Sequence, residues 1–207
     1  MIKNLFRHNL ALILVLILSS CKPDYSPEEK EYIAKIEQHR KDQNVYFMNS
    51  PDSPFNLKGK VRFHELNYFE VDPKFKFTSR IFEYQPKDTL TIYGTKGEAR
   101  KTVKYGFITF KFEERNHILN VYESVSRDGE KYYSIWFTDK TTNDESYGVG
   151  RYLDLEKKED PEYLYTIDFN LAYNPYCAYS PDYSCAIPTK EDYLDIEVEA
   201  GEKKFHD

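Results

Sequence analysis

The feature of this chain that most constrains its fold is a series of short runs, between Val61 and Ala200, in which apolar and polar residues alternate. The clearest run is YLYTIDFNL at 163–171, where Tyr163 and every second residue after it are apolar or aromatic. A second run, LDIEVEA at 194–200, alternates in the same way. Successive side chains of a β-strand point to opposite faces of the sheet, so this period of two predicts strands with one buried face.

Turn residues separate these runs and predict how the strands connect. Further strands are expected at 61–71, 75–84, 89–93, 103–113, 117–124 and 131–138. Asp128-Gly129 supplies the positive φ of a tight hairpin, and TKGE at 95–98 and EERN at 113–116 are the neighbouring turns. Loops this short join antiparallel strands, because a parallel pair needs a long crossover. The predicted fold is mainly β, an antiparallel meander that forms a barrel-like or sandwich domain.

One α-helix is predicted ahead of the strands. In Ser26-Pro27-Glu28-Glu29 a serine precedes a glutamate by three residues, with proline at the first helical position, which is a capping box. Ile33 and Ile36, with Tyr32, give the following segment one apolar stripe among charged residues. We therefore expect an N-terminal helix over 26–48, packed along the domain with its charges in water. A helix that binds a partner is the alternative interpretation.

The first twenty residues have the layout of a secretory signal peptide. MIKNLFRHNLALILVLILSSC has basic Lys3 and Arg7, an apolar run over 10–18 that is too short to span a bilayer, and small residues before Cys21. LSSC at 18–21 resembles the lipobox of bacterial lipoproteins, which implies cleavage before Cys21 and diacylation of its thiol. Several acyl chains hold a protein firmly, so we expect a lipid anchor rather than a membrane span.

The expected organisation is a signal peptide at 1–20, a tether at 21–25 and a single β-rich domain at 26–207. The whole chain has a net charge of −6, and removal of the signal peptide makes the remainder more acidic. This charge argues against nucleic-acid partners. Aromatic residues make up 16% of the chain, with 19 Tyr and 14 Phe, which indicates an aromatic-rich core.

Four segments carry a resemblance to a known family. They are SPDSPF at 50–55, YFEVDPKFKFTSRIFEY at 68–84, WFTDKTTNDESYGVGRYLDL at 136–155 and IDFNLAYNPYCAYSPDYSCAIPTKEDYLDIEVEAGEK at 167–203. Together they resemble the family catalogued as domain of unknown function 1684, and the last segment is the most specific. The family is similar to bacterial proteins without established biochemistry, so the resemblance implies a map of motifs and no reaction.

Cys177 and Cys185 are the cysteines left when Cys21 is lipidated. In an exported protein they are expected to form a structural disulfide that closes a short loop. A reactive cysteine is disfavoured because tyrosines and Asp182 surround the pair, where an activated thiol needs a base and positive charge.

No metal site or cofactor is predicted. The remaining histidines, His39, His64, His117 and His206, lack the spacing of zinc ligands. In the acidic segment that begins at Asp139, Asp144 stands where a calcium-binding loop needs glycine.

The candidate binding residues are Arg151, Asp168, Asn170, Tyr173 and Asn174. Alternation places Asp168 and Asn170 together on the polar face of the 163–171 strand, and Tyr173 and Asn174 follow where this strand ends. Arg151 follows two glycines and would supply a fixed charge for a carboxylate.

The alternative role for these residues is structural. Arg151 would then pair with Asp168 or Asp154 to stabilise the fold, and Asn174-Pro175 would simply start a turn.

Two functions of different class follow. The preferred one is a membrane-anchored envelope lipoprotein that binds a small molecule, a glycan or another envelope protein, facing the periplasm or the cell surface from the outer membrane. The other is a hydrolase-like enzyme with a polar site around Arg151, Asp168 and Asn170, which a strongly perturbed carboxylate in a concave pocket would favour.

Overall fold

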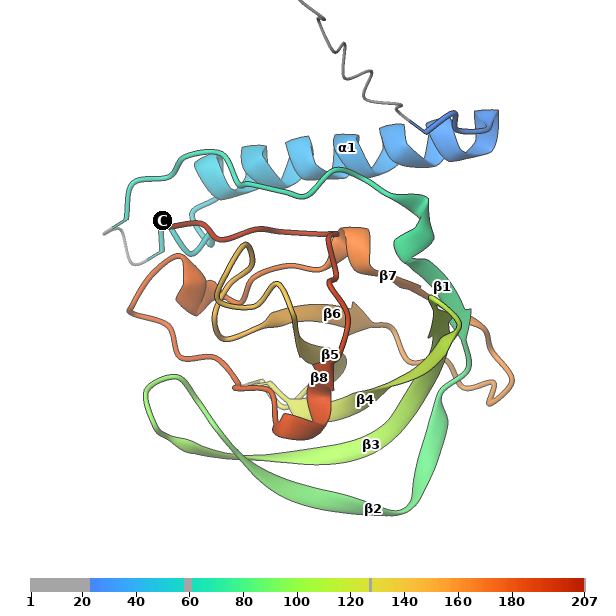
Figure 1. The fold of residues 1–207 in the computed structure, drawn as a ribbon. Helices are drawn as coiled ribbons and strands as arrows, with labels where there is room; N and C mark the ends of the chain where they lie inside the picture. The colour runs from blue at the N-terminus through green and yellow to red at the C-terminus, as the bar shows by residue number, and fades with distance from the viewer. Residues whose placement is uncertain (1–22, 58–60, 127, 207) are drawn as a thin grey trace, which may run out of the picture.

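The structure is a computed structural model that describes residues 23–57, 61–126 and 128–206. The predicted signal peptide and Cys21 lie outside these residues. Within them the chain is mainly β, with one long helix near the N-terminus, as predicted (Figure 1).

The helix begins at its predicted cap. α1 spans Pro27–Asn49, and Ser26 Oγ accepts a hydrogen bond from the Glu29 backbone N–H at 3.2 Å. The Glu29 carboxylate accepts in return from the Ser26 N–H at 2.8 Å. Both halves of the capping box are therefore present, and the helix ends at Asn49, one residue beyond the predicted end, with Ser50 as its C-cap.

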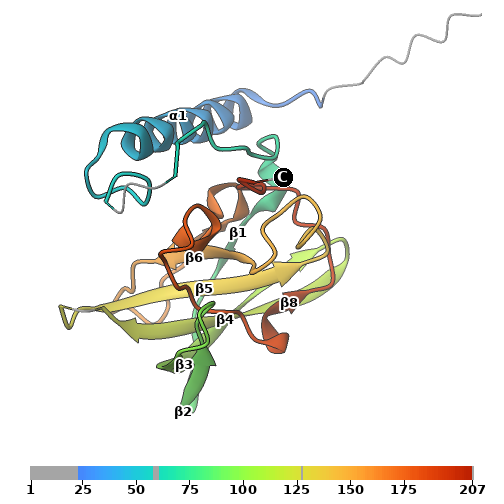
Figure 2. The same cartoon turned by 90° about the vertical axis from the view of Figure 1, so that its left-hand side faces the viewer.

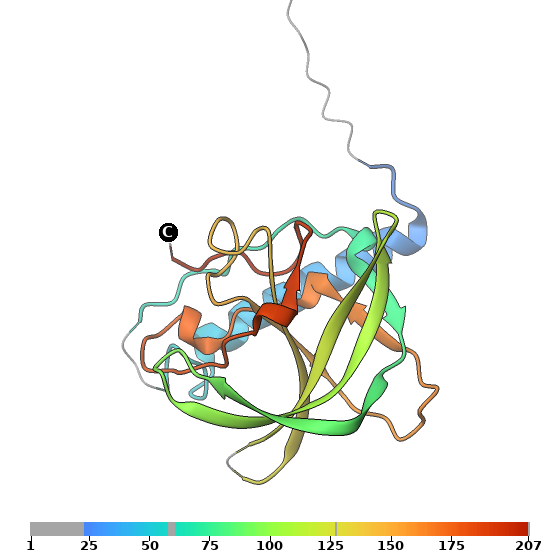
Figure 3. The ribbon, with the colours of Figure 1, turned by 60° about the horizontal axis from the view of Figure 1, so that its bottom comes forward.

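The main sheet is the predicted antiparallel meander. Its order is β2-β3-β4-β5-β6, with bounds Phe82–Tyr93, Ala99–Phe112, Arg115–Val125, Lys131–Asp139 and Arg151–Leu155. Gly97 and Gly129 have φ of +82° and +90° in the β2–β3 and β4–β5 turns, which confirms both glycine turns. The sheet curls into a half-barrel (Figure 3). The sequence predictions omitted β6.

The remaining short elements surround this sheet. β1, Lys76–Ser79, pairs with β7, Tyr165–Asp168, in a separate two-stranded antiparallel sheet. β8, Tyr193–Leu194, pairs with β5 in parallel, which corrects the expectation of purely antiparallel pairing. Four short 3₁₀ turns complete the described elements: η1 Pro73–Phe75, η2 Phe169–Leu171, η3 Tyr176–Ala178 and η4 Lys190–Asp192.

Four predicted strands are wrong in extent. The 61–71 run forms only an isolated bridge between Tyr68 and Glu202. The 163–171 strand stops at Asp168, because the Asp168 carboxylate accepts from the Asn170 N–H at 3.0 Å and caps η2. The 75–84 run is divided between β1 and β2.

The fourth run, at 194–200, keeps the predicted alternation of burial but forms no strand beyond β8. Ile196, Val198 and Ala200 are buried, whereas the residues between them are exposed. The carbonyls of Val198 and Ala200 accept hydrogen bonds from the Arg151 guanidinium. A side chain satisfies these backbone groups, so no neighbouring strand is required.

The hydrophobic core lies inside the curled sheet and continues under α1. The main cluster includes Ile108, Leu119, Ile135 and Phe137. A second cluster joins Phe47 of α1 to aromatic residues from distant segments, Phe55, Tyr179 and Phe205. In two views α1 lies on the side of β6, opposite β2 (Figures 1 and 2).

Among the described residues, no helix combines the length and the apolar character that a membrane span requires.

Candidate functional site

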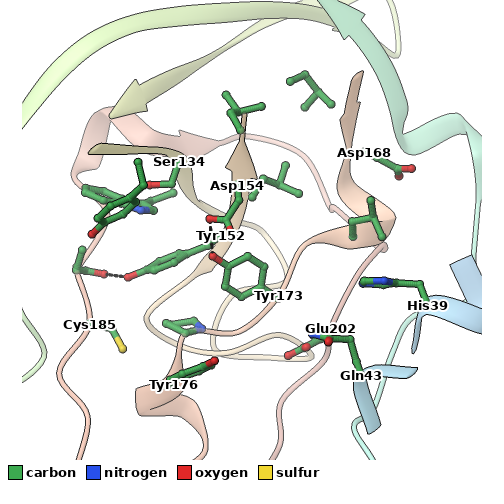
Figure 4. A pocket seen from close by; sticks show the side chains of 18 of the residues that line it. His39, Gln43, Ser134, Tyr152, Asp154, Asp168, Tyr173, Tyr176, Cys185 and Glu202 are labelled. Carbon is green, nitrogen blue, oxygen red and sulfur yellow. Dashed lines mark hydrogen bonds between the residues drawn. The ribbon is translucent and has the colours of Figure 1, made fainter. Parts of the chain in front are cut away.

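A cavity of about 920 Å³ lies between α1 and the sheet. Its walls come from one side of α1, from β5 and β6, and from the segment 173–186 (Figure 4). Tyr32, Ile36, His39, Gln43 and Phe47 are the wall residues of α1 that recur at helical spacing. The cavity therefore depends on a helix near the start of the chain and a loop near its end.

A row of aromatic rings forms one wall. Tyr122 of β4 is buried outside the lining and supports this wall by stacking on Trp136 of β5, with 4.4 Å between ring centroids and 9° between ring planes. Trp136 lies opposite Tyr152 of β6 in the sheet register, and Tyr152 forms an isolated bridge with Tyr173. The ring centroids of Trp136 and Tyr152 are 5.9 Å apart, and those of Tyr152 and Tyr173 are 6.0 Å apart. Backbone pairing therefore holds this wall in place.

Beside this wall lies a polar corner, which we define as Ser134, Asp154 and Tyr173. Ser134 of β5 is the register partner of Asp154 of β6, so their side chains lie on the same face of neighbouring strands. The Tyr173 hydroxyl donates to Asp154 Oδ1 at 2.7 Å. Asp154 is exposed to the cavity, yet the surrounding walls exclude enough water that desolvation raises its pKa.

Ser134 is the unusual member of the polar corner. Its side chain lines the cavity although the residue is only 2% exposed. Within the described part of the chain, its buried Oγ has no hydrogen-bond partner. Buried hydroxyls are normally paired, so this oxygen marks a position that favours a polar ligand atom.

Another carboxylate of the cavity wall, that of Glu202, is buried. Its Oε2 accepts from the Tyr179 hydroxyl at 2.5 Å and from the Asn174 backbone N–H at 2.9 Å. Desolvation raises the pKa of Glu202 to about 7, although these hydrogen bonds and the charges of Arg151 and Arg40 act in the opposite direction. Glu202 is therefore a carboxyl group that titrates close to neutral pH.

Polar contacts hold α1 over the cavity. The Tyr32 hydroxyl contacts both carboxylate oxygens of Asp168, at 2.8 and 2.7 Å, and accepts from Asn170 Nδ2 at 3.0 Å. Arg40 Nη1 donates to the Phe69 carbonyl at 2.8 Å. These contacts, together with the burial of Phe47 in the second core cluster, attach the helix at several points along its length.

The predicted binding residues lie in four places. Asp168 and Asn170 meet, but they are buried under α1, 6% and 1% exposed, instead of facing solvent. Tyr173 meets Asp154 in the polar corner, whereas Asn174 contacts the buried Glu202.

Arg151 is fully buried and lies apart from the other predicted residues. Its Nη2 is 2.6 Å from Asp139 Oδ2 and donates to the Val198 carbonyl at 2.8 Å. The predicted structural role of Arg151 holds, but its carboxylate partner is Asp139 rather than Asp168 or Asp154.

The family model described as protein of unknown function (DUF1684) matches residues 61–203. The chain belongs to this family. A solution NMR structure of an uncharacterized protein from gene locus rrnAC0354 of Haloarcula marismortui is similar to this DUF1684 chain, with a TM-score of 0.61. Its sequence is 26% identical, and the match covers 85% of this chain and 96% of that chain. A search of curated proteins found no match. The comparisons thus support the DUF1684 resemblance and the fold.

The two late cysteines of this DUF1684 chain are free thiols, which corrects the predicted disulfide. Their sulfurs are 3.1 Å apart, whereas a disulfide bond is about 2.05 Å long. The Cys177 N–H instead donates to Cys185 Sγ at 3.2 Å. A hydrogen bond with Cys185, assisted by the hydroxyls of Tyr147 and Thr95, lowers the pKa of Cys177 to about 6. Eight-residue spacing permitted closure of a disulfide but did not decide it.

Sequence reasoning missed Ser134 and Glu202, and it considered Asp154 only as a partner for Arg151. A signal for Ser134 was available, because it is a lone serine in the otherwise apolar and aromatic run YYSIWF at 132–137. Glu202 had no such local signal, since its burial depends on distant residues such as Tyr179. Within the described residues, no group of three or more histidine, cysteine or carboxylate side chains is arranged to hold a metal ion.

Proposed function

We propose that this DUF1684 chain is an envelope lipoprotein, anchored through a diacylated Cys21, whose cavity binds a small molecule. The cavity carries this proposal. Its volume of about 920 Å³ falls within the range of small-molecule sites, and aromatic rings with a few convergent polar groups line it. Of the partners considered from the sequence, a small molecule fits such a concave site better than a second protein does.

The anchor rests on the sequence alone. LSSC at 18–21 follows a basic start and an apolar run, and α1 begins at Pro27, shortly after Cys21. Lipidation there would hold α1, and the cavity it covers, close to the membrane surface. We place the protein on the outer membrane, facing the periplasm or the cell surface.

Metabolic labelling with an alkyne analogue of palmitate tests the anchor. We expect incorporation into the wild-type protein and none into Cys21→Ser. Unlabelled wild-type protein that keeps its initiator methionine would refute lipidation.

A neutral fluorescent probe, N-phenyl-1-naphthylamine, tests the cavity. Trp136 is the single tryptophan of the chain and lines the cavity, so bound probe should quench its emission. Gln43→Phe adds bulk to the cavity wall, whereas Gln38→Phe makes the same change on the exposed side of α1. We expect saturable binding that Gln43→Phe weakens and Gln38→Phe preserves. Absence of saturable binding, or equal binding by both variants, would contradict a ligand cavity here.

A second function, catalysis, is favoured by one observation. Glu202 is a buried cavity carboxyl with a pKa raised to about 7, which suits a general acid or base near neutral pH. An enzyme of this kind, hydrolase-like in class, would act through Glu202 rather than through Arg151, Asp168 and Asn170. A screen of hydrolase substrates should then find turnover that Glu202→Gln abolishes. Turnover that survives in Glu202→Gln would remove this assignment.

A further inference from the structure

Among the described residues, no lysine or arginine forms an ion pair with a carboxylate of the cavity, although Arg40 and Arg151 act on Glu202 from a distance. Asp154, Asp168 and Glu202 line the cavity, and their hydrogen-bond partners are neutral. These partners are the Tyr173 hydroxyl for Asp154, Tyr32 and Asn170 for Asp168, and Tyr179 and Asn174 for Glu202. Asp168 accepts on both oxygens, so Asp154 and Glu202 retain capacity for a ligand.

The basic residues of the lining face other partners. Lys35 pairs with Glu31 at 2.7 Å, and its side chain is 72% exposed. Arg100 pairs with Glu98 and donates to the Ser184 carbonyl at 2.7 Å. Lys76 is exposed, with its ammonium group 4.4 Å from the Tyr32 ring centroid. Positive charge is therefore placed at exposed positions, whereas the polar corner has negative charge and neutral donors.

Ser134 is the independent indication of a ligand in the polar corner. A buried hydroxyl without a partner is unfavourable for a fold, and the Oγ of Ser134 lies on the same sheet face as the Asp154 carboxylate. The Tyr173 hydroxyl occupies Oδ1 of Asp154, while Oδ2 accepts no hydrogen bond from the described residues. Asp154 and Ser134 thus have unused acceptor oxygens, one charged and one neutral, on the same face of neighbouring strands.

Aromatic rings flank this pair of acceptors. Tyr152 precedes Asp154 by two residues on the same face of β6, and Tyr173 reaches Asp154 from the other side. Aromatic faces attract organic cations and also take the apolar part of a ligand.

From these contacts we infer that the cavity takes an organic amine. Its primary or secondary ammonium group would donate to Asp154 Oδ2 and Ser134 Oγ, and its apolar body would lie against Tyr152, Tyr173 and Trp136. This inference rests on the proposed ligand cavity and assigns it a ligand class. A neutral sugar would leave the charge of Asp154 uncompensated, and an anion would be repelled.

Phenethylamine and 2-phenylethanol test this inference, because they share an apolar body and differ in the ammonium group. Each would displace N-phenyl-1-naphthylamine from the full-length protein at neutral pH, and each would also be titrated alone while Trp136 emission is followed. We expect the amine to bind about tenfold more tightly than the alcohol, which corresponds to one charged hydrogen bond.

Three variants locate the effect. Asp154→Asn should remove the preference for the amine, because the amide keeps an acceptor for Tyr173 but has no charge. Ser134→Ala should weaken amine binding severalfold and leave the alcohol unchanged. Asp128→Asn, in the exposed β4–β5 turn, makes the same charge change outside the cavity and should behave like the wild type.

Equal affinity for amine and alcohol would overturn the amine inference, as would a preference that survives in Asp154→Asn. Either result, with saturable probe binding intact, leaves the proposed ligand cavity standing. Loss of binding for the probe and both compounds would instead refute the cavity function itself.

Discussion

Replacement of Glu202 by glutamine should change how the stability of the protein depends on pH. Glu202 is buried, and its pKa rises from an ordinary value of 4.5 to about 7. Between these two pH values, Glu202 keeps its proton in the folded state, whereas in the unfolded state it has lost it. The contribution of Glu202 to stability must therefore fall as pH rises from about 4.5 to about 7, and this loss remains at higher pH. The pKa shift of Glu202 corresponds to a change of about 3 kcal/mol in the free energy of unfolding.

Glu202→Gln removes this titration and retains the shape of the protonated side chain. Its amide oxygen can still accept from the Tyr179 hydroxyl and the Asn174 N–H. Near pH 5 we expect the variant to lie within about 1 kcal/mol of the wild type, since Glu202 is protonated there. Near pH 8 the variant should be more stable by about 2–3 kcal/mol, because the wild type then buries a charge.

Urea denaturation at both pH values measures the free energy of unfolding directly. Glu156→Gln makes the same chemical change at an exposed position and should keep the pH dependence of the wild type. If Glu202→Gln also kept that dependence, or was the less stable protein near pH 8, the burial argument for Glu202 would be wrong.

Three further predictions follow from individual contacts. Tyr32→Phe removes the hydroxyl that donates to Asp168, so we expect a loss of about 1–2 kcal/mol and faster hydrogen exchange in α1. Arg151→Met leaves the carboxylate of Asp139 buried without its partner. Urea denaturation should show a free energy of unfolding lower by about 3–5 kcal/mol, and adding Asp139→Asn should restore part of it. Iodoacetamide should modify Cys177 without prior reduction, because its thiol is free. The rate of alkylation should rise with pH around a midpoint near pH 6, and this phase should be absent in Cys177→Ser. Protection from alkylation until reductant is added would contradict the free thiol.

Local sequence determined the features whose interactions span a few residues. The start of α1 depends on Ser26 and Glu29, which bond to each other across three positions, and it was predicted correctly. The turns at Gly97 and Gly129 depend on the φ of one residue and were also correct. The alternation of 194–200 predicted which side chains are buried.

Predictions failed where a distant residue changes the environment. Asp168 and Asn170 were expected to face solvent, since alternation places them opposite the core residues Ile167 and Phe169. α1 covers that second face, and Tyr32 provides the hydrogen bonds that make burial of a carboxylate possible. A period of two predicts which residues share a face, but it contains no information about what packs against it.

The candidate site shows the same division. The sequence indicated part of its aromatic wall, because the predicted strands contain many aromatic residues. The cavity itself needs α1 from residues 27–49, the β5–β6 register and the segment 173–186 to lie together. The sequence alone determined the central strands β3, β4 and β5, the glycine turns and the helix cap, because these depend on near neighbours and on backbone geometry. Only the tertiary structure decided the cavity, the unpaired Ser134 hydroxyl and the burial of Glu202, because desolvation depends on contacts between residues far apart in the chain.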